Sequence, residues 1–143
     1  MKESWPEAIA FTFQAEGYKS NIVGDAGGAT IYGISSAYWP HEFALIKAMT
    51  VENARAYAEE FYHTHFWSFI ECDSLPYPMD CVAFDCSVNP GPSWCKSALT
   101  ATKDWRKLLD MREFHYERVA HPNVLKGLVN RCNALREKYK EVT

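Results

Sequence analysis

The sequence lacks any long apolar run, because no segment approaches the roughly 20 consecutive apolar residues that a membrane-spanning helix needs. Residues 1–5 lead directly into an amphipathic pattern, without the hydrophobic core that is typical of a signal peptide. We therefore expect a soluble protein that begins in the cytosol without a signal peptide.

The sequence also lacks a run of Lys and Arg with interleaved aromatic residues, and its formal net charge is −3. These features disfavour nucleic-acid binding. Charge is unevenly distributed, because residues 1–95 hold 4 Lys/Arg and 12 Asp/Glu, whereas residues 96–143 hold 11 and 6. The basic C-terminal third either faces solvent or contacts an anionic membrane surface.

Closely spaced metal-ligand pairs are missing as well. Cys81 and Cys86 are five residues apart, and no histidine follows them at zinc-finger spacing. His63 and His65 are two residues apart in a predicted helix, so their side chains point to different sides. We therefore expect no metal and no cofactor. The five cysteines are an odd number, which in a cytosolic protein favours reduced and buried thiols.

The sequence does have enough apolar residues for one core, since 48% of its 143 residues are hydrophobic, and we expect one domain over 1–143. Ser4 and Glu7 form the pattern of a capping box that begins a helix, and Gly17 is suited to end it. The glycines that follow predict a small β lobe over 18–34. Apolar periodicity predicts further helices over residues 50–67, 79–89, 103–120 and 122–140. The expected fold class is mostly α (α+β), a helical bundle around a central buried helix at 79–89.

Glu16 is the first candidate catalytic residue. It falls in the last turn of the first helix, where the partial negative charge of the helix end favours a protonated carboxyl group. Asp25 and Thr30 follow in a glycine-rich segment that can fold back over this helix end and place an acid, a base and a water-binding hydroxyl in one cleft. The structural alternative is that Asp25 makes an Asx-turn and Thr30 only favours a strand.

These residues resemble the signature of family 108 glycoside hydrolases, lysozyme-like N-acetylmuramidases of phages and bacteria. The family pattern is Glu-Gly-Gly-Tyr, an Asp nine residues after the Glu, and then Gly-Gly-x-Thr-x-x-Gly-Ile. The sequence matches it at Glu16, Gly17, Asp25, Gly27, Gly28, Thr30, Gly33 and Ile34. Residues 83–91 resemble the family's Phe-Asp-x-x-Val-Asn-x-Gly helix end. Further similarity to its C-terminal peptidoglycan-associated region, about 90–143 here, lies at Arg112, Tyr116, Pro122, Gly127 and Arg131.

Two departures from the family pattern affect the expected cleft. Tyr18 stands where the family has a second glycine, so the chain enters the β lobe differently. The stretch from Trp94 to Leu109 lacks the family's glycine-rich loop, so one wall of the cleft is expected to be shorter. Neither departure changes Glu16, Asp25 or Thr30.

The resemblance implies a lysozyme-like fold and a role for each candidate residue. Glu16 would be the general acid, Asp25 would activate water or stabilise oxocarbenium charge, and Thr30 would help to hold that water. Asp85 and Asn89 lie four residues apart on one helix face, where they either hold a sugar or pin the helix to its neighbour. Tyr32 either stacks on a saccharide ring or packs in the core.

The expected function is a peptidoglycan hydrolase that cleaves the β-1,4 bond between N-acetylmuramic acid and N-acetylglucosamine. Its expected partner is the glycan strand, and we expect a monomer. The expected biological role is a phage endolysin that leaves the host cytoplasm through a holin and acts on periplasmic peptidoglycan. The alternatives are a secretion-associated bacterial muramidase and a catalytically silent peptidoglycan-binding or scaffold protein.

Overall fold

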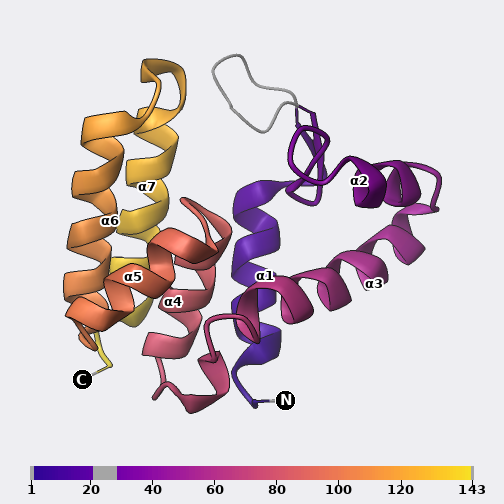
Figure 1. Cartoon of the computed structure of the whole chain (residues 1–143). Coiled ribbons are helices and arrows are strands. Elements are labelled where there is room, and N and C mark those ends of the chain that lie inside the picture. Colours follow the sequence, from indigo (N-terminus) through magenta and orange to yellow (C-terminus); the bar gives the residue numbers. More distant parts are fainter. Residues whose placement is uncertain (1, 21–28, 143) are drawn as a thin grey trace.

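The structure, a computed structural model, describes residues 2–20 and 29–142, which form seven α-helices and three short strands (Figure 1). In chain order these are α1 (Trp5–Glu16), β1 (Lys19–Ser20), β2 (Thr30–Ile31), β3 (Ile34–Ser35), α2 (Pro40–Lys47), α3 (Val51–Tyr62), α4 (Met79–Val88), α5 (Pro92–Ala101), α6 (Trp105–Val119) and α7 (Pro122–Tyr139). A π-helical turn (His63–Trp67) continues α3, and a 3-10 turn spans Cys72–Ser74. The prediction of a mostly helical α+β fold is confirmed.

Helix α1 ends as the sequence predicts but begins differently. Gly17 adopts φ 73°, and its N–H donates to the carbonyl of Phe13, so glycine ends the helix. The predicted capping box is wrong, because the Ser4 side chain caps no amide of α1. The Ser4 hydroxyl instead donates to the carboxylate of Asp80 in α4, which ties the start of α1 to the central helix.

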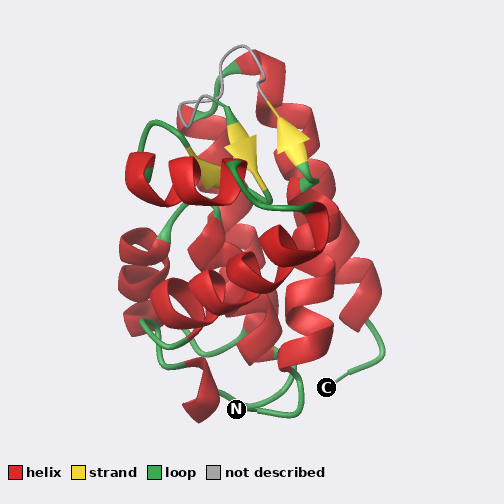
Figure 2. Ribbon diagram, turned by 90° about the vertical axis from the view of Figure 1, so that its right-hand side faces the viewer, coloured by secondary structure: helices red, strands yellow, loops and turns green. Residues whose placement is uncertain are grey.

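The β lobe is a three-stranded antiparallel sheet with the order β1-β2-β3, seen at one end of the molecule in Figure 2. Thr30 pairs with Ser35 and Ile31 with Ile34, so only Tyr32 and Gly33 form the turn between β2 and β3. Both have positive φ, 50° for Tyr32 and 81° for Gly33, as in a type I′ hairpin. This turn keeps the small sheet against the end of α1.

Helix α4 is the central helix, as predicted for residues 79–89. It contacts α1, α5, α6 and the π-helical turn, and every side chain from Met79 to Ser87 is buried. A helix that is apolar on most sides is usually buried, and α4 accordingly forms the centre of the hydrophobic core. Asn89 ends the helix in an extended conformation at the edge of a cleft.

Helices α2 and α5 lie outside the helices that the sequence predicts. Each begins with a proline, Pro40 and Pro92, which is favoured in the first turn because it has no N–H to leave unpaired. Helix α2 has one buried residue, Ile46, so its apolar periodicity is weak. Helix α5 packs on α4 and covers it from one side.

Helices α6 and α7 form an antiparallel hairpin along α4, and both were predicted. Asp104 caps α6 by accepting from the N–H of Arg106 at 2.9 Å. The five cysteines are buried, as the sequence predicts, and none forms a disulfide in the structure. Among the described helices, none combines the length and the hydropathy needed to cross a membrane.

Candidate active site

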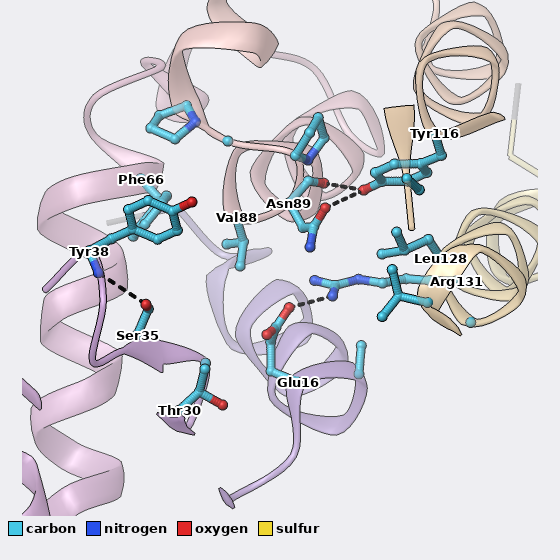
Figure 3. Close-up of a pocket in the computed structure, with 18 of the residues that line it drawn as sticks. Glu16, Thr30, Ser35, Tyr38, Phe66, Val88, Asn89, Tyr116, Leu128 and Arg131 are labelled. Carbon is cyan, nitrogen blue, oxygen red and sulfur yellow. Dashed lines mark hydrogen bonds and ion pairs between the residues drawn. The ribbon is translucent and has the colours of Figure 1, made fainter. Parts of the chain in front are cut away.

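A cleft of about 1170 Å³ lies between the β lobe and the α6–α7 hairpin. Figure 3 shows Thr30, Ser35 and Tyr38 on one side of Glu16, and Asn89, Tyr116 and Arg131 on the other. The cleft is larger than the 300–1000 Å³ that is usual for small-molecule sites. Its size and its mixed apolar and polar lining suit an extended ligand better than a compact one.

Glu16 lies in this cleft at the C-terminal end of α1. Its side chain is 17% exposed, so the carboxylate reaches the cleft while most of the side chain is covered. The chain can leave the helix directly after it because Gly17 adopts a positive φ. The sheet then returns to the same helix end, which brings Thr30 of β2 into the cleft wall.

Gly33 packs directly over Glu16. A Cβ atom at this position would lie 2.3 Å from the hydroxyl of Tyr62 and 2.9 Å from Oε1 of Glu16, so only glycine fits. The Tyr62 hydroxyl donates to the carbonyl of Tyr32 at 2.6 Å. Burial, assisted by the Glu16 carboxylate, raises the pKa of Tyr62 well above its usual value. Tyr62 therefore stays neutral and holds the β2–β3 turn against α1.

Asp85 lies behind Glu16 at the centre of a charge network. Arg131 donates to it twice, at 2.8 and 2.9 Å, Arg112 donates at 2.9 Å, and Thr12 donates at 2.7 Å. Burial alone would raise the pKa of Asp85, but the two guanidinium groups outweigh burial and hold this pKa well below its usual range. The Asp85 side chain is 1% exposed, so its contacts are those of the pinning alternative rather than those of a sugar ligand.

Arg131 connects this network to the cleft, because its Nη1 atom donates to Oε2 of Glu16. The guanidinium thus bridges the carboxylates of Glu16 and Asp85. Its side chain is 9% exposed and lines the cleft beside Leu128 (Figure 3). In this structure the Glu16 carboxylate is therefore ion-paired.

Asn89 lines the cleft, a position that the sugar-binding alternative requires. The single proton of the Tyr116 hydroxyl is shared between Oδ1 and the backbone carbonyl of Asn89, each 2.8 Å from the hydroxyl oxygen. Tyr116 in turn accepts from Nε of Arg112 at 3.0 Å. With its oxygen occupied, the Asn89 amide has its NH₂ group left to donate to a ligand.

The remaining predicted residues are found in different surroundings. Asp25 lies outside the described residues. Tyr32 is 8% exposed and its ring contacts Phe13 and Tyr18, which matches the packing alternative rather than sugar stacking. Thr30 in β2 is only 8% exposed, but it still lines the cleft.

Sequence reasoning did not identify Arg131, Tyr62 or Tyr38 as site residues. A signal for Arg131 does exist, because it interrupts the apolar stripe that Leu128 and Leu135 form on α7, and a basic residue on such a stripe needs a buried partner. Tyr62 carries no comparable signal, since tyrosine is common in helix cores. Tyr38 is held at the cleft edge because Oγ of Ser35 accepts from its N–H at 3.1 Å.

Comparison with known proteins agrees with this architecture. No curated protein was found to match the chain. The solved structure of Brucella abortus SagA has the same fold, with a TM-score of 0.76 and 21% sequence identity over 99% of this chain and 96% of that chain. Residues 9–91, which include Glu16, Thr30 and Asn89, match the family described as Glycosyl hydrolase 108. The chain therefore belongs to glycosyl hydrolase family 108, and its family activity is glycoside hydrolysis.

Proposed function

We propose that this protein is an N-acetylmuramidase that cleaves the β-1,4 bond between N-acetylmuramic acid and N-acetylglucosamine in peptidoglycan. Family membership supports peptidoglycan hydrolysis at the family level. The observation that carries the proposal is the Glu16 carboxylate in a cleft of about 1170 Å³, with Thr30 on the wall opposite Arg131. A carboxyl group in a cleft of this size can protonate a glycosidic oxygen.

In this mechanism Glu16 protonates the oxygen of the scissile bond. The C1–O bond breaks, its electron pair goes to that oxygen, and positive charge develops on the sugar ring. Asp25 activates the attacking water or stabilises this charge, and the Thr30 hydroxyl helps to hold the water. Activation of water by Asp25 predicts inversion at C1, because an inverting enzyme needs room for a water molecule between its two carboxyl groups.

The Asn89 amide is the polar substrate contact that we propose for the helical wall. Its orientation is supported by the shared hydrogen bond from Tyr116. An NH₂ donor at this position can bind a sugar hydroxyl or the carbonyl of an acetamido group. Its location at the cleft edge, beside Val88 and across from Tyr38, suits a sugar next to the one that reacts.

The test compares the wild type with Glu16→Gln in a turbidity assay on Gram-negative cells with permeabilised outer membranes. Loss of the proton donor should reduce the rate by about 10²- to 10⁴-fold. Glu60→Gln is the matched control, because Glu60 is exposed on α3 and should tolerate the same change. A Glu16→Gln variant that clears cells at the wild-type rate would end the assignment. A wild type that binds walls without releasing fragments would favour the silent scaffold.

We further propose that the protein acts as an endolysin that reaches the periplasm through a holin. Expression in the cytoplasm of a Gram-negative host should lyse the cells only when a holin is expressed with it. A catalytically inactive Glu16→Gln chain expressed with the same holin is the control for damage by the pore alone. Lysis without the holin would contradict this role and favour a secreted muramidase.

A further inference from the structure

Arg131 is the one described cation that the structure links directly to Glu16 by a hydrogen bond. Its Nε and Nη2 atoms donate to Oδ2 and Oδ1 of Asp85 at 2.9 and 2.8 Å, which is the planar two-bond fork that Arg forms with carboxylates. The third donor, Nη1, is directed at Oε2 of Glu16. One rigid group therefore contacts a buried carboxylate and a cleft carboxylate at once.

The position of this guanidinium does not depend on Glu16. Asp85 is held from two other helices, by Oγ1 of Thr12 at 2.7 Å and by Nη1 of Arg112 at 2.9 Å. Because Asp85 and Arg112 are almost fully buried, these bonds fix the carboxylate plane to which Arg131 must align. The Nη1 donor of Arg131 is consequently oriented before any substrate binds.

This arrangement makes the two oxygens of Glu16 unlike each other. Oε2 accepts from Arg131, whose guanidinium can only donate, so a proton on Oε2 would oppose that N–H. Oε1 lies on the side of the β lobe, 2.9 Å from the position that a Cβ atom on Gly33 would take. The proton that a general acid must carry is therefore favoured on Oε1.

We propose that Arg131 is a positioning residue that assigns the transferable proton of Glu16 to Oε1 and stabilises the carboxylate that remains after transfer. The inference rests on the proposed function of Glu16. As the C1–O bond breaks, its electron pair goes to the glycosidic oxygen, which takes the proton from Oε1. The negative charge left on Glu16 is then neutralised by the guanidinium that already contacts Oε2.

The inference predicts opposite pH effects for two neighbouring substitutions. Arg131→Gln removes the cation that contacts Oε2 of Glu16, so the alkaline limb of kcat/KM should shift to higher pH. Asp85→Asn removes the anion that neutralises Arg131, so the cation acts more strongly on Glu16 and the same limb shifts downward. A loss of stability alone would not give shifts of opposite sign.

Other groups near Glu16 must be considered in this profile. Burial keeps Tyr62 neutral over the pH range of the assay, and the sheet side of the cleft presents uncharged Thr30, Gly33 and Ser35. The described titratable and charged groups that face Glu16 or its cleft are Arg131 on α7, Asp85 on α4 behind it, Tyr62 on α3, Tyr38 between β3 and α2, His115 and Tyr116 on α6, and His121 at the α6–α7 turn. Repeating the comparison in a His115→Asn, His121→Asn background removes the imidazole titrations.

The experiment measures kcat and KM on soluble peptidoglycan strands from pH 4 to pH 9 for the full chain and its variants. Arg131→Gln should lower kcat about tenfold with little change in KM, and should move the alkaline limb to higher pH. Arg131→Lys keeps the positive charge but loses the two-bond contact with Asp85. The alkaline limb of its kcat/KM profile should therefore stay near the wild-type position, while its kcat falls. Circular dichroism checks that each variant is folded.

Thr12→Val is the matched control, because it removes one hydrogen bond to Asp85 without changing any charge. Its alkaline limb should coincide with that of the wild type. If Arg131→Gln does not fold, the limbs of Asp85→Asn and Arg131→Lys still test the inference. The inference would be overturned if the alkaline limb of kcat/KM did not shift in Arg131→Gln. It would also be overturned if this limb shifted in the same direction in Arg131→Gln and in Asp85→Asn. An inactive wild type would instead overturn the proposed function.

Discussion

Gly33 is a single residue whose place in the site could be predicted from the sequence pattern. Its match to the family signature, together with Glu16 and Thr30, predicted a site that the fold does bring together in one cleft. The physical reason appears only in three dimensions, since Gly33 touches Glu16 and Tyr62 across the turn. Arg131 also belongs to the family resemblance, but its pairing with Glu16 could not be predicted, because the contact joins residues 115 positions apart.

Gly33→Ala should damage both the fold and the site. The added Cβ would meet the Tyr62 hydroxyl at 2.3 Å and Oε1 of Glu16 at 2.9 Å, and the residue would have to keep φ 81°. Crowding of this kind costs about 1–3 kcal/mol, and displacement of Glu16 should lower the lysis rate at least about 10²-fold. Chemical denaturation and the turbidity assay measure the two effects.

Gly127→Ala is the opposite control for stability, because Gly127 lies within α7 with nothing within 4 Å of an added Cβ. It should raise the free energy of unfolding by about 0.5–1 kcal/mol. A Gly33→Ala variant with wild-type stability and activity would show that the turn is not packed against Glu16 as described here.

Asp85→Asn should lower the free energy of unfolding by about 3–5 kcal/mol near neutral pH, because it leaves the buried charges of Arg112 and Arg131 without their partner. Since the folded pKa of Asp85 is lowered, its contribution is complete above the unfolded pKa of about 4. The contribution is lost as the pH falls below that value toward the folded pKa.

Urea denaturation between pH 7 and pH 2 measures this dependence. The difference in stability between the wild type and Asp85→Asn should be largest near pH 7 and should narrow below about pH 4. A difference that stays constant down to pH 2 would mean that the charge of Asp85 does not contribute to stability.

At the scale of elements, the sequence predicts the long periodic helices and their approximate ends well, but it misses α2 and α5 and wrongly predicts one capping side chain. Helices α4, α6 and α7 follow from their apolar patterns, whereas α2 has too few buried residues to produce one. The capping box at Ser4 fails for a tertiary reason: the hydroxyl finds a partner on another helix, Asp80. The residues around Ser4 in the sequence do not reveal that Asp80 competes with the helix amides for its hydroxyl.

A double-mutant cycle tests the tertiary role of Ser4. Ser4→Ala and Asp80→Asn should couple by about 0.5–3 kcal/mol in the free energy of unfolding, because the two side chains are hydrogen-bonded. Ser4→Ala and Glu7→Gln should show almost no coupling, since Ser4 caps no amide of α1. Comparable coupling between Ser4→Ala and Glu7→Gln would support the capping box that the sequence predicts.

At the scale of the whole molecule, the basic C-terminal third is less basic at its surface than its composition suggests. Arg112 and Arg131 are used inside the protein to neutralise Asp85 and Glu16. Arg136 is paired with Asp110 and with Glu113. These pairs favour the solvated interpretation of the α6–α7 charge over contact with an anionic membrane.

We therefore predict that the inactive Glu16→Gln variant does not kill Gram-negative cells whose outer membrane is intact. Arg112, Arg131 and Arg136 are ion-paired within the protein, which leaves fewer basic groups on the α6–α7 hairpin to contact anionic lipids. Counting survivors after exposure to the purified variant measures this, with the wild type on permeabilised cells as the positive control. Killing by Glu16→Gln at the wild-type level would show an additional action on membranes.

We have proposed that Glu16, at the end of α1, protonates the glycosidic oxygen of peptidoglycan. The most direct test of this proposal is the reducing end of the fragments that purified protein releases from isolated cell walls, identified by borohydride reduction and mass spectrometry. We expect N-acetylmuramic acid at the new reducing ends with the wild type and with Glu60→Gln, and new ends that form at least about 10²-fold more slowly with folded Glu16→Gln. N-acetylglucosamine at those ends, or fragments released equally by Glu16→Gln, would contradict it.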